Sequence, residues 1–190
     1  MSTVTSPPLV DAHETRAWGA RLGRLLRAGD LVILTGDLGA GKTTLTQGIA
    51  EGLGVRGPIT SPTFVIARVH PSLAEGPVLV HVDAYRLAGW SELDDLDLDA
   101  DLDRAVTVVE WGRGLAEELS GAALDITLAG ESVRTATVLA RGERWAGDRA
   151  LAELAQLAAP AESVADIADA GQTGDAGQTA DAAAGRESRP

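Results

Sequence analysis

Residues 36–47 read GDLGAGKTTLTQ, and residues 36–43 match the phosphate-binding pattern G-x-x-x-x-G-K-[ST] in full. Lys42 in this stretch is the only lysine of the chain, whose other fifteen basic residues are arginines. A compact ammonium on a flexible stem can reach between the β- and γ-phosphates of a nucleotide, where a planar guanidinium is too wide. The stretch therefore predicts nucleotide binding rather than an ordinary glycine-rich turn.

The glycines of this loop also suit phosphate binding. Gly36, Gly39 and Gly41 allow the backbone to turn tightly and to bring successive N–H groups within reach of phosphate oxygens. The helix expected to follow adds roughly half a positive charge at its N-terminus. The hydroxyl of Thr43 is then placed for Mg²⁺.

The segments around the loop predict an α/β fold. Residues 31–35 (LVILT) are wholly apolar, as in a parallel strand buried on both faces, and a helix is expected over 42–53. The alternation of apolar strands and helical segments, followed by a hairpin, indicates a P-loop NTPase-like, mostly parallel sheet flanked by helices. The other expected elements are a helix over 12–27 capped by Asp11, strands at 63–70, 78–82 and 105–109, and an antiparallel C-terminal hairpin of 123–129 with 134–142.

The composition changes near residue 146, and we expect two regions. Residues 1–148 would form the P-loop domain, and residues 149–190 an Ala/Asp/Gly-rich tail. The start of the tail, 149–158, is compatible with a helix. The repeats DAGQTG (169–174) and DAGQTA (175–180) cannot bury enough apolar surface to offset the entropy of ordering, so we expect the rest of the tail to be disordered.

Charge and composition narrow the choice of function. The formal net charge of −12 repels phosphate backbones, so any contact with RNA is expected to go through a partner. The chain has no cysteine, which excludes thiolate metal sites and a cysteine nucleophile. The N-terminus lacks the basic and apolar regions of a signal peptide, and no apolar run is long enough to span a membrane. A cytoplasmic protein without a membrane partner is expected.

Two acidic residues follow apolar strands. Asp83 ends the strand VLVHV and Glu110 ends AVTVV, so both carboxylates should emerge at the sheet edge where the phosphate loop lies. Either acid could hold a magnesium-bound water or orient the attacking water, and spacing alone does not assign the two roles. The SPT segment at 61–63 offers hydroxyls on a loop that could sense the γ-phosphate, or could be an ordinary turn.

The motifs GDLGAGKTTLTQGIAEGLG, SPTF, HVDAYRL, ELDDL and VVEWG occur in this order. Over roughly residues 10–145 the chain resembles the TsaE family, the P-loop ATPases of bacterial threonylcarbamoyl-adenosine tRNA modification. The resemblance implies slow ATP hydrolysis in support of a complex of TsaD and TsaB, with ATP or ADP and Mg²⁺ as cofactors and with tRNA reached only through these partners.

The resemblance also implies roles for individual residues. Thr43 and Glu110 would coordinate Mg²⁺, and Asp83 would assist hydrolysis or hydrogen-bond to a water that is bound to the metal. Trp111 would lie against the nucleotide, Arg134 near it, and the helix around Thr15 would approach the base. The residues implied to bind the nucleotide are Gly39, Ala40, Gly41, Lys42, Thr43, Thr44, Trp111 and Arg134.

Two other functions use the same loop. A small-molecule kinase is one alternative, although Arg68, Arg86, Arg104 and Arg113 are scattered and do not form a clustered lid. A nucleotide-gated interaction module with negligible hydrolysis is the other. A partner-stimulated ATPase is the function that we expect.

Overall fold

The computed structural model describes residues 2–73, 75–94 and 103–160. Within these residues seven strands form one sheet in the order β1-β7-β6-β2-β5-β4-β3. The strands are β1 (Ser2–Thr5), β2 (Leu31–Thr35), β3 (Ala67–His70), β4 (Val78–Asp83), β5 (Ala105–Glu110), β6 (Ala123–Ala129) and β7 (Thr135–Arg141). The helices are α1 (Ala12–Gly23), α2 (Lys42–Leu53), α3 (Trp90–Asp94) and α5 (Asp148–Ala155), with short 3₁₀ turns η1 (Ala84–Arg86), η2 (Ala116–Leu119), η3 (Glu143–Trp145) and η4 (Gln156–Ala158).

The centre of the sheet is parallel and its edges are antiparallel. Strands β4, β5, β2 and β6 run parallel, β7 pairs antiparallel with β6, and β1 and β3 close the two edges in antiparallel pairing. Every residue of β5 is buried, as expected for a parallel strand covered on both faces. The expected α/β class, the mostly parallel sheet and the C-terminal hairpin are confirmed.

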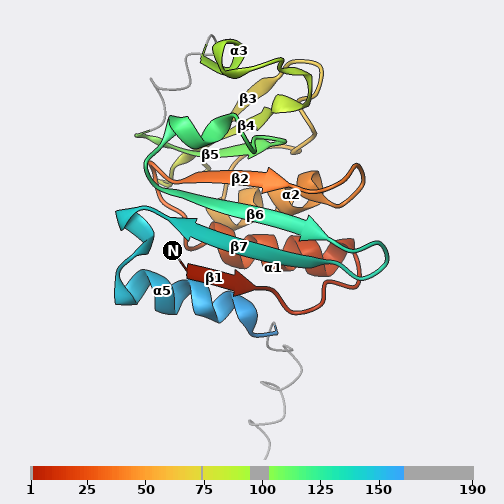
Figure 1. The fold of residues 1–190 in the computed structure, drawn as a ribbon, viewed down its shortest axis with the longest axis vertical. Helices are drawn as coiled ribbons and strands as arrows, with labels where there is room; N and C mark the ends of the chain where they lie inside the picture. The colour runs from red at the N-terminus through yellow and green to blue at the C-terminus, as the bar shows by residue number, and fades with distance from the viewer. Residues whose placement is uncertain (1, 74, 95–102, 161–190) are drawn as a thin grey trace, which may run out of the picture.

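The two faces of the sheet pack against different parts of the chain. Alternate residues such as Val32 and Val108 belong to the apolar cluster that contains residues of α1 and α2, whereas Ile33 and Val109 belong to the cluster on the other face. Figure 1 shows α1 and α2 together behind the sheet. The side chains of β4 and β5 that point to this side therefore point toward the helix that follows the phosphate loop.

Glycines allow α1 and α2 to approach closely. A Cβ atom on Gly48 would lie 2.1 Å from the carbonyl oxygen of Arg16, and one on Gly23 would lie 2.3 Å from that of Ile49. The two helix backbones are thus in direct contact, which fixes the position of α2 and of the loop before it.

Two boundaries differ from the expected ones by more than one residue, and one strand was not expected. Helix α1 ends at Gly23 rather than residue 27, because the N–H groups of Leu25 and Leu26 donate three residues back and tighten the last turn. Strand β3 begins only at Ala67, after Ile66 with a positive φ of 67°. Strand β1 was not expected; its residues pair with β7 from Ser2↔Ala140 to Thr5↔Thr137.

The segment after residue 148 begins with a packed helix. Leu154 and Leu157 are buried in the core, and the indole N–H of Trp18 donates to the carbonyl oxygen of Leu157 at 2.9 Å. Figure 1 shows α5 next to β1, at the far edge of the sheet from β3. The expected boundary between residues 148 and 149 falls one residue inside α5, and the expected disordered remainder includes residues 161–190, which lie outside the described residues.

Candidate functional site

The phosphate loop connects β2 to α2 at the carboxyl edge of the parallel strands. Gly39 and Gly41 adopt φ values of 81° and 102°, in the left-handed region that favours glycine. Gly41 is also the N-cap of α2, and it makes no side-chain hydrogen bond to the first N–H groups of the helix. These N–H groups and the positive end of the helix dipole face a cavity of about 460 Å³.

Lys42 lies at the floor of this cavity, with only 5% of its surface exposed. Its Nζ donates to the carbonyl oxygens of Gly36 at 2.7 Å and Asp37 at 2.9 Å, and lies 3.7 Å from the ring centroid of Trp111. Burial lowers the pKa of Lys42, while the nearby carboxylates, Glu110 foremost, oppose the shift. The charged form of a lysine that is buried in this way would be stabilised by a negatively charged phosphate group.

Glu110 and Thr43 are in contact at the wall of the cavity. The Thr43 hydroxyl donates to Oε2 of Glu110 at 3.2 Å, so the end of β5 and the first turn of α2 are in contact. Oε1 of the same carboxylate lies 2.9 Å from Nε2 of His81, which is fully buried in β4. Hydroxyl and carboxylate oxygens are the donors that Mg²⁺ prefers, so this pair fits that ion.

Within the described residues no group of three or more His, Cys, Asp or Glu side chains could hold a metal ion. Magnesium at Thr43 and Glu110 would thus depend on phosphate oxygens and water for its remaining ligands, as is usual for this ion. The donor set fits a nucleotide-bound Mg²⁺ and does not fit a metal site made by protein side chains alone.

Asp83 has a different set of partners. Ser61 donates to its Oδ2 at 3.0 Å, and the Thr63 hydroxyl makes a short contact with the same oxygen. The backbone N–H of Tyr85 donates to Oδ1 at 3.0 Å. The two hydroxyls of the SPT segment are thus directed at a carboxylate of the site, and Asp83 is 96% buried beside the cavity.

Trp111 forms one wall of the cavity. It follows Glu110 with a φ of 62°, a rare conformation for a bulky residue, and its N–H donates to the carbonyl oxygen of Leu34 at 2.9 Å. Its ring lies over the Lys42 ammonium and packs at a tilt against Tyr85, with 5.2 Å between the ring centroids. The sharp turn after β5 thus places an aromatic surface beside the phosphate loop.

Of the other residues expected at the site, only some line the cavity. Thr44 lines the cavity, but Ala40 does not, and the Ala40 N–H donates to the Asp37 carbonyl oxygen at 3.1 Å. Nη2 of Arg134 donates to the carbonyl oxygen of Gly39 at 3.4 Å, and Arg134 does not line the cavity. Its Nε is buried and has no hydrogen-bond partner among the described residues. Thr15 is also close, with its Cγ2 3.8 Å from where a Cβ on Gly41 would lie.

The structure adds residues that the sequence did not assign to this site. Leu38 and Tyr85 line the cavity, and His81 contacts Glu110. The only sequence signal for Tyr85 and His81 was their place in HVDAYRL on either side of Asp83. Leu38 had no sequence signal beyond its position in the loop. Its side chain is 90% exposed.

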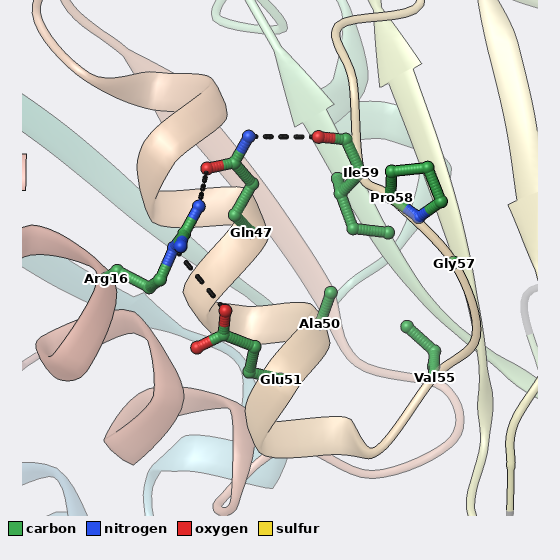
Figure 2. Close-up of a pocket in the computed structure, with 8 residues that line it drawn as sticks. All are labelled: Arg16, Gln47, Ala50, Glu51, Val55, Gly57, Pro58 and Ile59. Carbon is green, nitrogen blue, oxygen red and sulfur yellow. Dashed lines mark hydrogen bonds and ion pairs between the residues drawn. The ribbon is translucent and has the colours of Figure 1, made fainter. Parts of the chain in front are cut away.

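A second hollow, of about 220 Å³, lies between α1, α2 and residues 55–59 (Figure 2). Figure 2 shows that its polar groups are paired with one another. Nε of Arg16 lies 3.4 Å from Glu51, and Arg16 also donates to the Gln47 amide oxygen, while the Gln47 amide N–H donates to the carbonyl oxygen of Ile59 at 2.9 Å. We therefore place the candidate site at the phosphate loop.

Comparison with known proteins identifies the family to which the chain is similar. Residues 9–138 match the family model described as "Threonylcarbamoyl adenosine biosynthesis protein TsaE". A tRNA threonylcarbamoyladenosine biosynthesis protein TsaE from Streptomyces coelicolor is 61% identical over 69% of this chain and 93% of its own length, and one from Bacillus subtilis is 39% identical over 72% and 85%. The crystal structure of Bacillus subtilis YdiB is similar, with a TM-score of 0.64, 32% identity, and coverage of 82% of this chain and 95% of that one.

Proposed function

The chain belongs to the TsaE family of tRNA threonylcarbamoyladenosine biosynthesis, and on this premise we propose that it binds ATP with Mg²⁺ at the phosphate loop and hydrolyses it slowly. The observation that carries the proposal is the cavity in which Lys42, the N-terminus of α2 and the carboxylates of Asp83 and Glu110 converge. Gly39, Gly41, Lys42, Thr43 and Thr44 would bind the phosphates, with Trp111 and Arg134 beside the nucleotide.

The positive groups of the loop would hold the triphosphate. The Lys42 ammonium would exchange its bonds to the backbone carbonyls of Gly36 and Asp37 for bonds to phosphate oxygens. The backbone N–H groups at the start of α2 would hold further phosphate oxygens. Because Lys42 is buried, its interaction with phosphate is weakened little by solvent.

Thr43 and Glu110 would hold the metal. When bound, Mg²⁺ neutralises charge on the phosphates and stabilises the charge that develops during transfer. The hydrogen bond between the Thr43 hydroxyl and Oε2 of Glu110 supports this assignment, because it brings two suitable oxygen donors together at the cavity wall.

Asp83 would orient the attacking water. Its carboxylate is fixed on both oxygens, by Ser61 and Thr63 on one side and by the N–H of Tyr85 on the other. A carboxylate held in this way can accept a hydrogen bond from water with little loss of entropy. Because Ser61 and Thr63 contact Asp83, the loop of residues 61–63 would respond to the γ-phosphate.

We assign TsaD and TsaB as the partners that this ATPase supports, and the cytoplasm as its location. Membership of a family of threonylcarbamoyl adenosine biosynthesis supports partners from that pathway. The net charge of −12 supports indirect contact with tRNA, because a surface of this sign repels the tRNA backbone. No described helix is long and apolar enough to cross a membrane.

Reconstitution of the modification tests this function. Purified TsaD and TsaB, threonylcarbamoyl-adenylate, tRNA and ATP would be combined with the wild-type chain, with Lys42→Ala, or with neither. We expect multiple-turnover product only with the wild-type chain, and with the control Arg16→Ala, which removes a cation from the hollow of Figure 2. Product formation that does not depend on the chain would overturn the proposal. In a separate incubation of the chain with ATP and a mixture of small metabolites, a phosphorylated metabolite in place of free phosphate would indicate a kinase.

A further inference from the structure

We propose that His81 is a positioning residue for the magnesium ligand Glu110, an inference that rests on the proposed function. His81 lies in the middle of β4 and is completely buried. Its Nε2 is 2.9 Å from Oε1 of Glu110, which is itself only 3% exposed. A pair that is buried so deeply cannot change partners freely with water.

The register of the sheet explains how the two residues meet. His81 pairs with Val108, and Glu110 follows two residues later on the same face of β5. Asp83, two residues after His81, pairs with Glu110 directly. His81 therefore reaches Glu110 diagonally, from a position nearer the start of the parallel strands, whereas the phosphate loop lies at their carboxyl ends.

Each oxygen of the Glu110 carboxylate has its own hydrogen-bond partner. Oε1 accepts from Nε2 of His81, whereas Oε2 accepts from the hydroxyl of Thr43. Since a carboxylate only accepts, Nε2 of His81 donates the hydrogen of this bond. The Nδ1 atom has no hydrogen-bond partner within the described segments. His81 thus leaves Oε2 as the oxygen that faces the metal-binding side.

The geometry points to a role in metal affinity rather than in nucleotide contact. His81 is absent from the residues that line the phosphate cavity, so it acts through Glu110. Groups that hydrogen-bond to metal ligands typically contribute about 10- to 100-fold to metal affinity. A histidine that only filled the core would instead affect nucleotide binding with and without Mg²⁺ to the same extent.

Calorimetric titration of the full chain with ADP separates these two roles. It is done once in the presence of Mg²⁺ and once in the presence of EDTA. We expect His81→Leu to raise the Mg²⁺ concentration required for half of the effect on ADP affinity by about 10- to 100-fold. The ADP affinity in EDTA should stay at the wild-type value. Binding of Mn²⁺ in the presence of ADP, measured by electron paramagnetic resonance, should weaken by the same factor.

Two further variants test the hydrogen bond itself. A glutamine amide can take the place of Nε2, whereas an asparagine is too short to do so, so His81→Gln should keep the Mg²⁺ response and His81→Asn should lose it. Val82→Ala is the control for lost packing, because Val82 is fully buried in β4 but faces the other side of the sheet. The asparagine and glutamine pair also keeps the test valid if His81→Leu does not fold.

The outcomes distinguish this inference from the proposed function. Wild-type protein that binds ADP with a Mg²⁺ response, together with a normal response in His81→Leu and His81→Asn, would overturn the role of His81 alone. Equal weakening of ADP binding with Mg²⁺ and with EDTA would overturn it too, in favour of a packing role. Wild-type protein that does not bind ADP would overturn the proposed function itself.

Discussion

Asp83 and Glu110 are direct register partners at the ends of two parallel strands, yet their carboxylates are held by different elements. Glu110 contacts Thr43 in the first turn of α2, whereas Asp83 contacts Ser61 and Thr63 in the loop before β3. One acid is therefore linked to the first turn of α2, and the other to the separate loop before β3. This difference favours Glu110 as the metal ligand and Asp83 as the group that orients water.

The division of roles predicts different defects for the two acids. Asp83→Asn should keep Mg²⁺-dependent ADP binding but lower kcat for ATP hydrolysis by about 10²- to 10⁴-fold, the usual contribution of a positioned acid or base. Glu110→Gln should instead weaken the response of ADP binding to Mg²⁺. Calorimetry and steady-state phosphate release measure the two effects. Loss of the Mg²⁺ response in Asp83→Asn with normal binding in Glu110→Gln would reverse the assignment.

The close contact of α1 and α2 predicts that Gly48→Ala destabilises the fold. In an exposed helix this change normally stabilises by about 1 kcal/mol. Here the new Cβ would meet the Arg16 carbonyl oxygen at 2.1 Å, so we expect a loss of about 1–3 kcal/mol. Urea unfolding measures the change, with Gly121→Ala as control because a Cβ there meets nothing within 4 Å. Equal stability of the two variants would argue against direct backbone contact.

The packing of α5 predicts that its buried leucine stabilises the whole domain. Leu154 is completely buried, and Leu154→Ala should cost about 2–5 kcal/mol in the free energy of unfolding. Leu151→Ala, at a half-buried position of the same helix, should cost less. If the domain ended at residue 148, neither change would alter unfolding, and thermal melts of both variants decide the matter.

His70 predicts a loss of stability on the acid side of neutrality. Burial, with repulsion from His81 and Arg68, lowers the pKa of His70 from its ordinary value of 6.5. The unfolded chain then binds a proton more readily than the native state, so stability should fall as the pH decreases below 6.5 toward the lowered pKa. His70→Asn should reduce this dependence in urea titrations at different pH values. The exposed control His13→Gln should leave it unchanged; a dependence that is the same in His70→Asn would exclude His70 as its source.

Local patterns predicted the central elements of the fold well. The bounds of β2 and α2, 31–35 and 42–53, agree with the expected ones, because an apolar run and flanking glycines determine both. Strand β1 could not be predicted in this way. Its burial alternates between half-buried and exposed over four residues, and its place in the sheet comes from pairing with β7, far away in the chain.

The positions of the candidate residues could be predicted better than their contacts, and their roles stay predictions. The strand-end positions of Asp83 and Glu110 placed both acids at the phosphate-loop edge, as the structure has them. The contact of His81 with Glu110 depends on the register of β4 against β5, which no single strand reveals. The positive φ of Trp111, which brings its ring over Lys42, likewise depends on the turn after β5.

Calorimetric titration of the full chain with ATP and Mg²⁺, repeated with Lys42→Ala, tests nucleotide binding at the phosphate loop most directly. We expect the wild-type chain and Arg16→Ala to bind at one site, and Lys42→Ala to lose binding, because no other lysine can replace the buried ammonium. Binding of ATP by Lys42→Ala with the affinity of the wild-type chain would contradict this site.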